Sequence, residues 1–105
     1  ETLNHFMQGS TVESTFGLGW RLNGAGMGYM FGDYASPKAF GHTGWTGCLA
    51  IHDPEYALTI LYLTNRKQSP VISAKENPHL FKADRLPAGR YPNIIHSIYQ
   101  ELGLI

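Results

Sequence analysis

The segment Ala57–Thr64 limits the choice of fold most strongly, because nearly every one of its positions is apolar. Side chains along an extended strand alternate between its two faces. The apolar residues fall on both faces of such a strand, with Leu58, Ile60 and Tyr62 on one face and Ala57, Leu61 and Leu63 on the other. A strand with two apolar faces is typical of the centre of a sheet that is covered on both sides. We therefore expect a central strand here, with one face covered by a preceding part of the protein or by a partner chain.

Three further strands are expected beside it in one antiparallel sheet. Phe40–Thr43 and Cys48–His52 are short runs with strand character, and the turn Asp53-Pro54-Glu55 after the second run favours a hairpin. Phe16–Leu22 alternates large residues with small or polar ones, which is typical of a strand with one buried face. The pattern as a whole predicts a short antiparallel sheet.

Helices and loops are expected around this sheet. Pro92–Leu102 carries large apolar residues at helical spacing, and Glu1–Gln8 carries a shorter stripe of the same kind. Asn23–Ala39 and Asn65–Arg90 are expected to be loops, the second with a turn of helix near Val71–Lys75. The chain is thus predicted to be α+β, one unit over residues 1–105 in which a C-terminal helix packs on one face of an antiparallel sheet.

The first of these loops is rich in glycine and aromatic residues. Long segments without regular structure often carry function, although an irregular surface insertion would have the same composition. Two interpretations of Tyr29, Phe31 and Tyr34 therefore remain open: they line a substrate cleft, or they pack within their own loop.

The composition argues against several classes of function. Eight basic and eight acidic residues cancel. Without a Lys/Arg cluster or a basic amphipathic helix, we expect neither nucleic acid nor a membrane surface as a partner. No histidine spacing is typical of a metal site, so no metal or other cofactor is expected. Because the chain begins at Glu1 rather than Met, we expect that an N-terminal part has been removed.

The segment from residue 41 to residue 47 reads Gly-His-Thr-Gly-Trp-Thr-Gly and connects two of the predicted strands. Gly44 and Gly47 lack a Cβ atom, so a substrate backbone could lie close to the strand. Thr43 offers a hydroxyl that donates and accepts, and His42 brings an imidazole, which changes its charge near neutral pH. Backbone N–H groups just after Thr43 could face a developing oxyanion. These features predict an active site at an edge of the sheet.

This segment is preceded by Gly-Leu-Gly-Trp at residues 17–20 and followed by Leu-Thr-Asn-Arg at residues 63–66. In that order the three blocks resemble the C-terminal third of the class C β-lactamase-like serine hydrolases, which include penicillin-binding proteins, D-amino-acid peptidases and carboxylesterases. The resemblance covers residues 16–66 and the final helix. It implies a fragment of the β-lactamase/transpeptidase-like fold, an amide or ester substrate such as a cell-wall peptide, and a bacterial parent protein that is exported or membrane-anchored.

The resemblance also implies roles for four residues. His42 stands where β-lactamases carry Lys and would hold the hydrogen-bond and charge network of the catalytic site. The backbone N–H of Trp45 would be the second oxyanion donor, beside the N–H of a serine that this chain lacks. Thr43 would hydrogen-bond a substrate carboxylate or amide, and Gly44 would leave room for the acyl group. A histidine in place of the lysine favours a peptidase or an esterase over a β-lactamase.

The family's nucleophile and general base come from a Ser-x-x-Lys motif, which has no counterpart in these 105 residues. Tyr91-Pro92-Asn93 matches the family's Tyr-x-Asn motif by its letters, but it follows His-Thr-Gly instead of preceding it. The chain alone is therefore expected to be inactive and to supply one wall of a serine hydrolase site. The alternative is a catalytically inactive relative that only binds. The uncovered apolar strand face also predicts self-association of the isolated chain through Leu58, Ile60 or Leu61.

Overall fold

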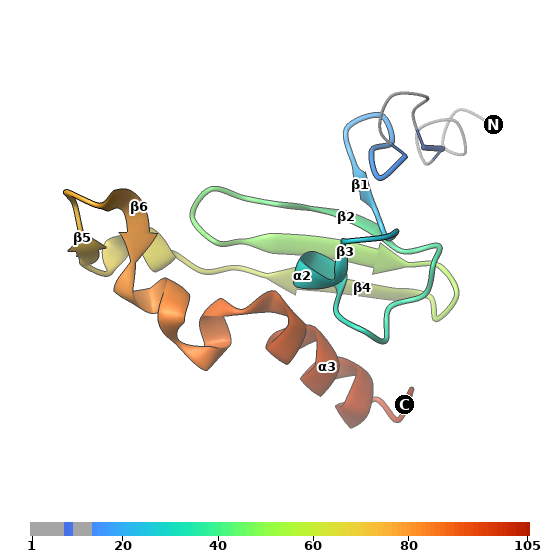
Figure 1. Cartoon of the computed structure of the whole chain (residues 1–105). Coiled ribbons are helices and arrows are strands. Elements are labelled where there is room, and N and C mark those ends of the chain that lie inside the picture. Colours follow the sequence, from blue (N-terminus) through green and yellow to red (C-terminus); the bar gives the residue numbers. More distant parts are fainter. Residues whose placement is uncertain (1–7, 10–13) are drawn as a thin grey trace.

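The main sheet of this computed structural model, which describes residues 8–9 and 14–105, has four antiparallel strands. They lie in the order β1-β2-β3-β4 and comprise β1 (Arg21–Leu22), β2 (Phe40–Thr43), β3 (Leu49–Asp53) and β4 (Leu58–Tyr62) (Figure 1). The last helix, α3 (Tyr91–Glu101), runs alongside the sheet. The fold is α+β, as predicted. Residues 1–7 of the predicted helix Glu1–Gln8 lie outside the described residues.

One face of the sheet, here called the covered face, packs against two helices. Leu49, Ile51 and Ile60 are buried on it. They meet side chains from α3 and from the short helix α2 (Gly28–Phe31), which lies within the predicted loop Asn23–Ala39. The helical members of this core are Met30, Phe31, Ile95 and Tyr99, all completely buried. Burial of apolar side chains at roughly 25 cal/mol per Å² makes this layer the main source of stability in the described chain.

A buried carboxylate joins the covered face to the helix and to the loop before β2. Asp53 is completely buried. Its Oδ2 accepts hydrogen bonds from the N–H of Ser36 at 2.7 Å and from the hydroxyl of Tyr99 at 2.6 Å. Its Oδ1 accepts from the Ser36 hydroxyl at 2.5 Å and from the N–H of Glu55 at 3.2 Å. Burial raises the pKa of the Asp53 carboxyl, but these hydrogen bonds outweigh that effect and leave its pKa below the usual value.

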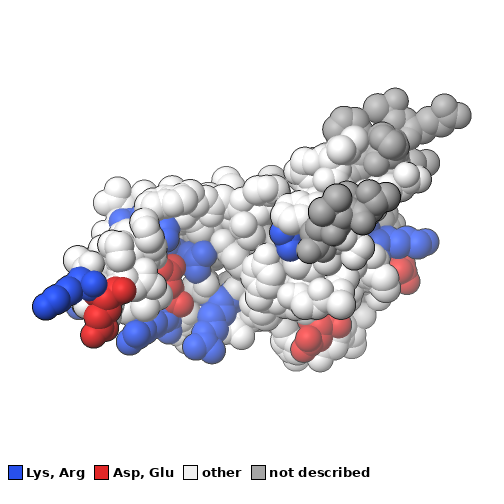
Figure 2. Space-filling model, turned by 45° about the horizontal axis from the view of Figure 1, so that its top comes forward, with Lys and Arg blue, Asp and Glu red and all other residues white. Residues whose placement is uncertain are grey.

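Residues 66–90 form a separate small lobe, here called the β5–β6 lobe. It contains the hairpin of β5 (Val71–Ser73) and β6 (Asn77–Phe81) and three short 3₁₀ turns. The predictions of a loop over Asn65–Arg90 and of a helical turn near Val71–Lys75 were therefore wrong. The lobe holds six of the eight basic residues but only two of the eight acidic ones, so the neutral chain has one basic end (Figure 2).

The expected strand Phe16–Leu22 is mostly a turn. Gly19 has a positive φ of 83°, and the N–H of Gly17 donates to the carbonyl of Trp20 at 2.8 Å. The chain folds back so that Phe16 bridges to Arg21, which leaves only Arg21–Leu22 to pair with β2. The glycines therefore allow a tight turn, whereas the alternation of residue sizes had suggested an extended strand.

The expectation that Ala57–Thr64 lies at the centre of the sheet was also wrong, because β4 is the edge strand of the described sheet. Ile60 is buried on the covered face, whereas Leu61 and Leu63 are 66% and 77% exposed. The other face, here called the open face, has a shallow groove of about 180 Å³ lined by residues that include Trp20, Phe40 and Leu61.

Over the described residues, no helix has the length and apolar character needed to cross a membrane.

Candidate active site

The last two residues of β2 lie at an open edge of the sheet. β1 pairs only with Phe40 and Gly41, so His42 and Thr43 have a strand partner on the β3 side alone among the described residues. Gly41 is required here for steric reasons, because a Cβ atom on it would lie 2.1 Å from the carbonyl oxygen of Ala50. An edge with free backbone groups is a place where an extended peptide can lie beside a strand.

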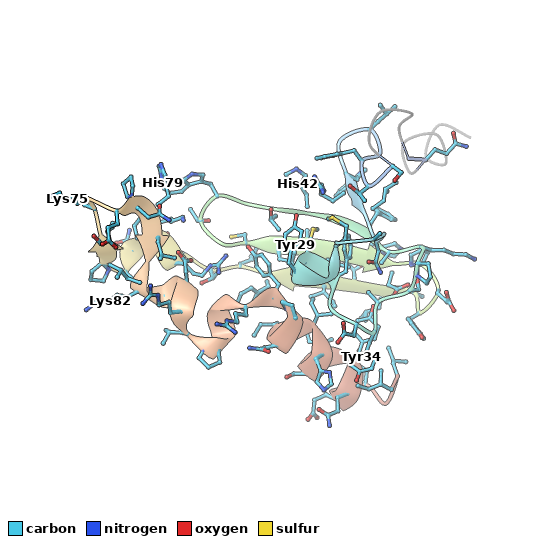
Figure 3. All side chains as sticks on the ribbon, in the orientation of Figure 1. Tyr29, Tyr34, His42, Lys75, His79 and Lys82 are labelled. Carbon is cyan, nitrogen blue, oxygen red and sulfur yellow. The ribbon has the colours of Figure 1, made fainter. Side chains whose placement is uncertain are left out.

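His42 is exposed, and its side chain lies on the side of β2 away from α3 (Figure 3). The register that pairs it with Ala50, and Ala50 with Leu61, places it on the open face. Its Nδ1 is 2.5 Å from the carbonyl oxygen of Thr43. Since a carbonyl oxygen only accepts, Nδ1 carries the proton and donates. In the neutral ring Nε2 is then free to accept a proton at the open face.

Thr43 and Gly44 differ from His42 in where they face. Thr43 pairs with Leu49, and by the alternation of the strand its side chain points to the covered face. The N–H of Gly44 donates to the carbonyl of Cys48 at 2.8 Å, and a Cβ atom on Gly44 would lie 3.4 Å from the Cβ of Cys48. The missing side chain of Gly44 thus leaves space next to Cys48.

Trp45 begins the turn between β2 and β3 and is 68% exposed. Its backbone N–H has no hydrogen-bond acceptor within residues 8–9 and 14–105. Its ring contacts that of Phe81 edge-on, with the centroids 6.4 Å apart, and the Lys67 ammonium lies 4.6 Å from its centroid. The turn therefore offers a free N–H beside β2 and an aromatic ring that reaches toward the β5–β6 lobe.

The turn is stabilised by the residues that follow β4. The thiol of Cys48 donates to the carbonyl of Thr64 at 3.2 Å, and hydrogen bonds to the sulfur from Thr46 and from the backbone of Thr64 lower the pKa of this thiol. The N–H of Arg66 donates to the carbonyl of Thr46 at 2.9 Å. The sequence suggests for Arg66 a solvated or ion-paired residue at a strand end; the structure confirms an ion pair, with Asp84 at 3.5 Å, and the Arg66 side chain is just 15% exposed.

The structure brings the four predicted site residues together in one short stretch but does not direct them all to one side. His42 faces the open side and Thr43 the covered side, while Trp45 presents its N–H in the turn. Of the aromatic residues in the loop before β2, Phe31 belongs to the core, and Tyr34 packs against the ring of His96 with the centroids 4.8 Å apart. No cluster of His, Cys, Asp and Glu suited to a metal ion occurs in the described part of the chain.

Comparison with known proteins gives related chains of much greater length. The chain is 48% identical over 103 residues to an N-acetylmuramyl-L-alanine amidase of Bacillus subtilis (strain 168). It is 43% identical over 103 residues to a putative D-alanyl-D-alanine carboxypeptidase of Escherichia coli (strain K12) and 47% identical to one of Salmonella paratyphi B. These alignments cover 97% of this chain but only 23% to 24% of the relatives, so the chain spans about a quarter of their length.

A family model described as Beta-lactamase matches residues 1–85, which is most of the chain. No solved structure gives a significant match. The matched segment includes β1 to β4 and the His-Thr-Gly turn, which are the parts that form the candidate site. By this match, and by its identity to the relatives above, the chain belongs to the beta-lactamase family.

Proposed function

We propose that this chain forms the His-Thr-Gly wall and the oxyanion side of the active site of a serine hydrolase that cleaves amide or ester bonds. The end of β2 supports this most directly, because the exposed imidazole of His42 and the N–H of Trp45, which has no acceptor among the described residues, are three residues apart at an open strand edge. A substrate lying along that edge would present its carbonyl oxygen to an N–H donor, which is how acyl-transfer enzymes stabilise a tetrahedral intermediate.

In this proposal each residue has a limited task. The Nε2 of His42 accepts or donates a proton on the open face, and the Trp45 N–H binds the oxyanion. Thr43 and Gly44 line the substrate edge, Thr43 through its backbone because its side chain lies on the covered face. The nucleophile comes from residues that precede this chain in the full-length protein, so the isolated chain is inactive.

The substrate that we propose is a cell-wall peptide or its amide linkage to the glycan. Support comes from the relatives, whose names describe a carboxypeptidase for D-alanyl-D-alanine and an amidase for N-acetylmuramyl-L-alanine. An open strand edge also suits an extended peptide, because backbone hydrogen bonds along the edge can hold it in register.

The test compares the full-length protein with residues 1–105 alone. We expect the full-length protein to release product from muramyl peptides and to be labelled covalently by a fluorescent serine-directed phosphonate, whereas the isolated chain does neither. Binding of the peptides without turnover or labelling would replace the proposal by that of an inactive binding module. Stoichiometric labelling of the isolated chain at any serine would show that the nucleophile had been assigned wrongly.

A further inference from the structure

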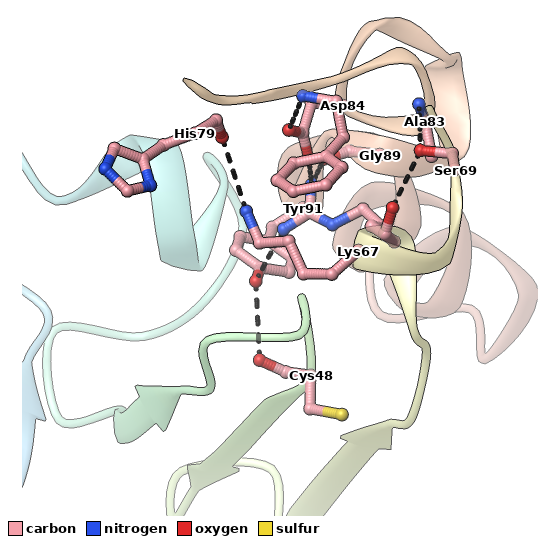
Figure 4. Close-up of polar contacts among 10 residues, drawn as sticks. Cys48, Lys67, Ser69, His79, Ala83, Asp84, Gly89 and Tyr91 are labelled. Carbon is pink, nitrogen blue, oxygen red and sulfur yellow. Dashed lines mark hydrogen bonds and ion pairs between the residues drawn. The ribbon is translucent and has the colours of Figure 1, made fainter. Parts of the chain in front are cut away.

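The guanidinium of Arg66 lies against the turn that carries Trp45, and the Arg66 side chain is only 15% exposed. Figure 4 shows Asp84, Gly89 and Tyr91, which are its partners, together with Cys48 of the turn. Gly47 in this turn has a φ of 101°, and a Cβ atom placed on it would lie 2.2 Å from the Nε of Arg66. The two groups are thus in direct contact, with no room for any side chain at position 47. A close-packed contact of this kind sets the distance between the turn and the β5–β6 lobe.

Arg66 is held from three directions, and each of its partners belongs to a distant part of the sequence. One terminal nitrogen donates to the carbonyl of Gly89, and the other donates to the hydroxyl of Tyr91 at 2.9 Å. The carboxylate of Asp84 lies 3.5 Å away and forms an ion pair. A planar guanidinium with several fixed donors suits such a junction, whereas a lysine ammonium would reach fewer of these partners.

The turn is connected to this junction at two points. The backbone N–H of Arg66 donates to the carbonyl of Thr46, and the hydroxyl of Tyr91 donates to the carbonyl of Cys48 at 3.3 Å. The turn is closed internally by the N–H of Gly47, which donates to Gly44 at 3.0 Å. Both carbonyl contacts lie within three residues of Trp45, next to the backbone that orients its N–H.

We propose that Arg66 is a positioning residue for the oxyanion-binding N–H of Trp45, an inference that rests on the proposed hydrolase function. Arg66 does not touch the substrate. Its side chain supports the turn from the side of the β5–β6 lobe. The N–H of Trp45 is thereby already directed toward the open edge of β2 before a substrate binds. Preorganised donors of this kind lower the barrier because no reorganisation is needed during the reaction.

The experiment uses three variants of the full-length protein. Arg66→Met removes the guanidinium with its contacts to Asp84, Gly89 and Tyr91 but keeps the backbone hydrogen bond to Thr46. Tyr91→Phe removes one hydroxyl while leaving the packing in place. Arg85→Met is the matched control, because Arg85 is an exposed arginine of the same lobe without a contact to the turn among the described residues. We expect Arg66→Met to lower kcat about 10- to 100-fold with KM changed less than about twofold, Tyr91→Phe to do the same more weakly, and Arg85→Met to match the wild type.

A second measurement separates positioning from general damage. The ratio of kcat/KM for an ester and for the matching thionoester reports on the oxyanion donors, because sulfur is the poorer acceptor. We expect this preference for oxygen to fall in Arg66→Met and to persist in Arg85→Met. Equal rates and equal ratios in the two arginine variants would overturn the role of Arg66.

Hydrogen–deuterium exchange of the peptide that spans Thr43–Cys48 provides a readout without turnover. We expect faster exchange in Arg66→Met than in Arg85→Met, since the turn loses its support. If the wild type hydrolyses nothing, the proposed function fails, while the exchange result still decides whether Arg66 holds the turn. Unchanged exchange in Arg66→Met would contradict the inference whatever the activity of the wild type.

Discussion

Both faces of the sheet carry apolar residues, but helices of the described chain cover only one of them. On the covered face, Leu49, Ile51 and Ile60 are buried under α2 and α3. On the open face, Phe40 and Leu61 border a shallow groove, and Leu61 remains 66% exposed. The predicted catalytic imidazole lies on the open face. The comparison teaches that the apolar core of the described chain forms on one face, while the other face stays open.

The largest effect is expected from a change on the open face. In the full-length protein His42→Ala should lower kcat/KM for an amide or ester by about 10²- to 10⁴-fold, because a positioned proton-transfer group is lost. Steady-state kinetics with His79→Ala as the control checks this, since His79 is an exposed histidine of the β5–β6 lobe. If His42→Ala is as active as His79→Ala, His42 has no part in catalysis. The proposal that the open face carries the active site would then lose its main support.

The matching change on the covered face should affect folding. Asp53→Asn replaces a carboxylate that accepts four hydrogen bonds by an amide that must point its NH₂ group at donors. We expect a loss of about 2–4 kcal/mol in the free energy of unfolding, since buried donors are left without an acceptor. Urea unfolding is the measurement, and Asp33→Asn, at an exposed aspartate, is the control. A loss no greater than in the control would mean that the covered face does not depend on this carboxylate.

Acidification should lower the free energy of unfolding, because it protonates the Asp53 carboxylate on the covered face. The pKa of Asp53 is lower in the folded chain than in the unfolded chain, so its contribution to stability is fully present above the unfolded value of about 4 and is lost as the pH falls through the folded value. Thermal unfolding followed from pH 7 down to pH 3 should show this loss in the wild type. The Asp53→Asn variant should show a smaller dependence on pH, and an identical dependence would assign the acid sensitivity to other carboxylates.

The smallest effect on folding is expected at Leu61. We expect the isolated chain to self-associate through the open face, because Leu58 and Ile60 are packed into the core and only Leu61 of the three predicted residues is exposed. Leu61→Asp should change the free energy of unfolding by less than about 0.5 kcal/mol but shift sedimentation toward the monomer. Leu102→Asp, at an exposed leucine next to α3, is the control. A wild-type chain that is monomeric at high micromolar concentration would rule out the interface.

Short-range patterns were sufficient to predict β2, β3, β4 and α3 within two residues of their ends. Apolar alternation and helical spacing decide such elements locally. The pattern could not place β4 at an edge of the described sheet. Apolar residues on both faces of a strand indicate that both faces are buried, but they do not indicate which segments bury them. The hairpin of β5 and β6 was missed because none of its strand residues is buried, so there is no apolar periodicity to detect.

The residues of the candidate site are adjacent in the sequence, whereas the contacts that support them are not. The motif Gly-His-Thr-Gly-Trp-Thr-Gly and the family resemblance led to the prediction of His42 and of the Trp45 N–H as site groups. Nothing near Arg66 in the sequence points to Gly89 or Tyr91, which lie 23 and 25 residues away. The burial of Asp53 depends in the same way on Tyr99, 46 residues further along the chain. Long-range polar contacts of this kind follow from the folded arrangement and leave no local signal.

The hydrogen bond from Tyr91 to the carbonyl of Cys48 also has a consequence for the order of events during translation. The two residues are 43 positions apart, and the tyrosine is added to the growing chain after the turn that it fastens. A nascent polypeptide that has already emerged with β2 and β3 must therefore wait for the first residue of α3 before this turn can reach its final shape. Ribosome-bound chains stopped before and after Tyr91 has left the exit tunnel should differ in protease sensitivity at the turn, which would make the final shaping of this turn a late step of biogenesis.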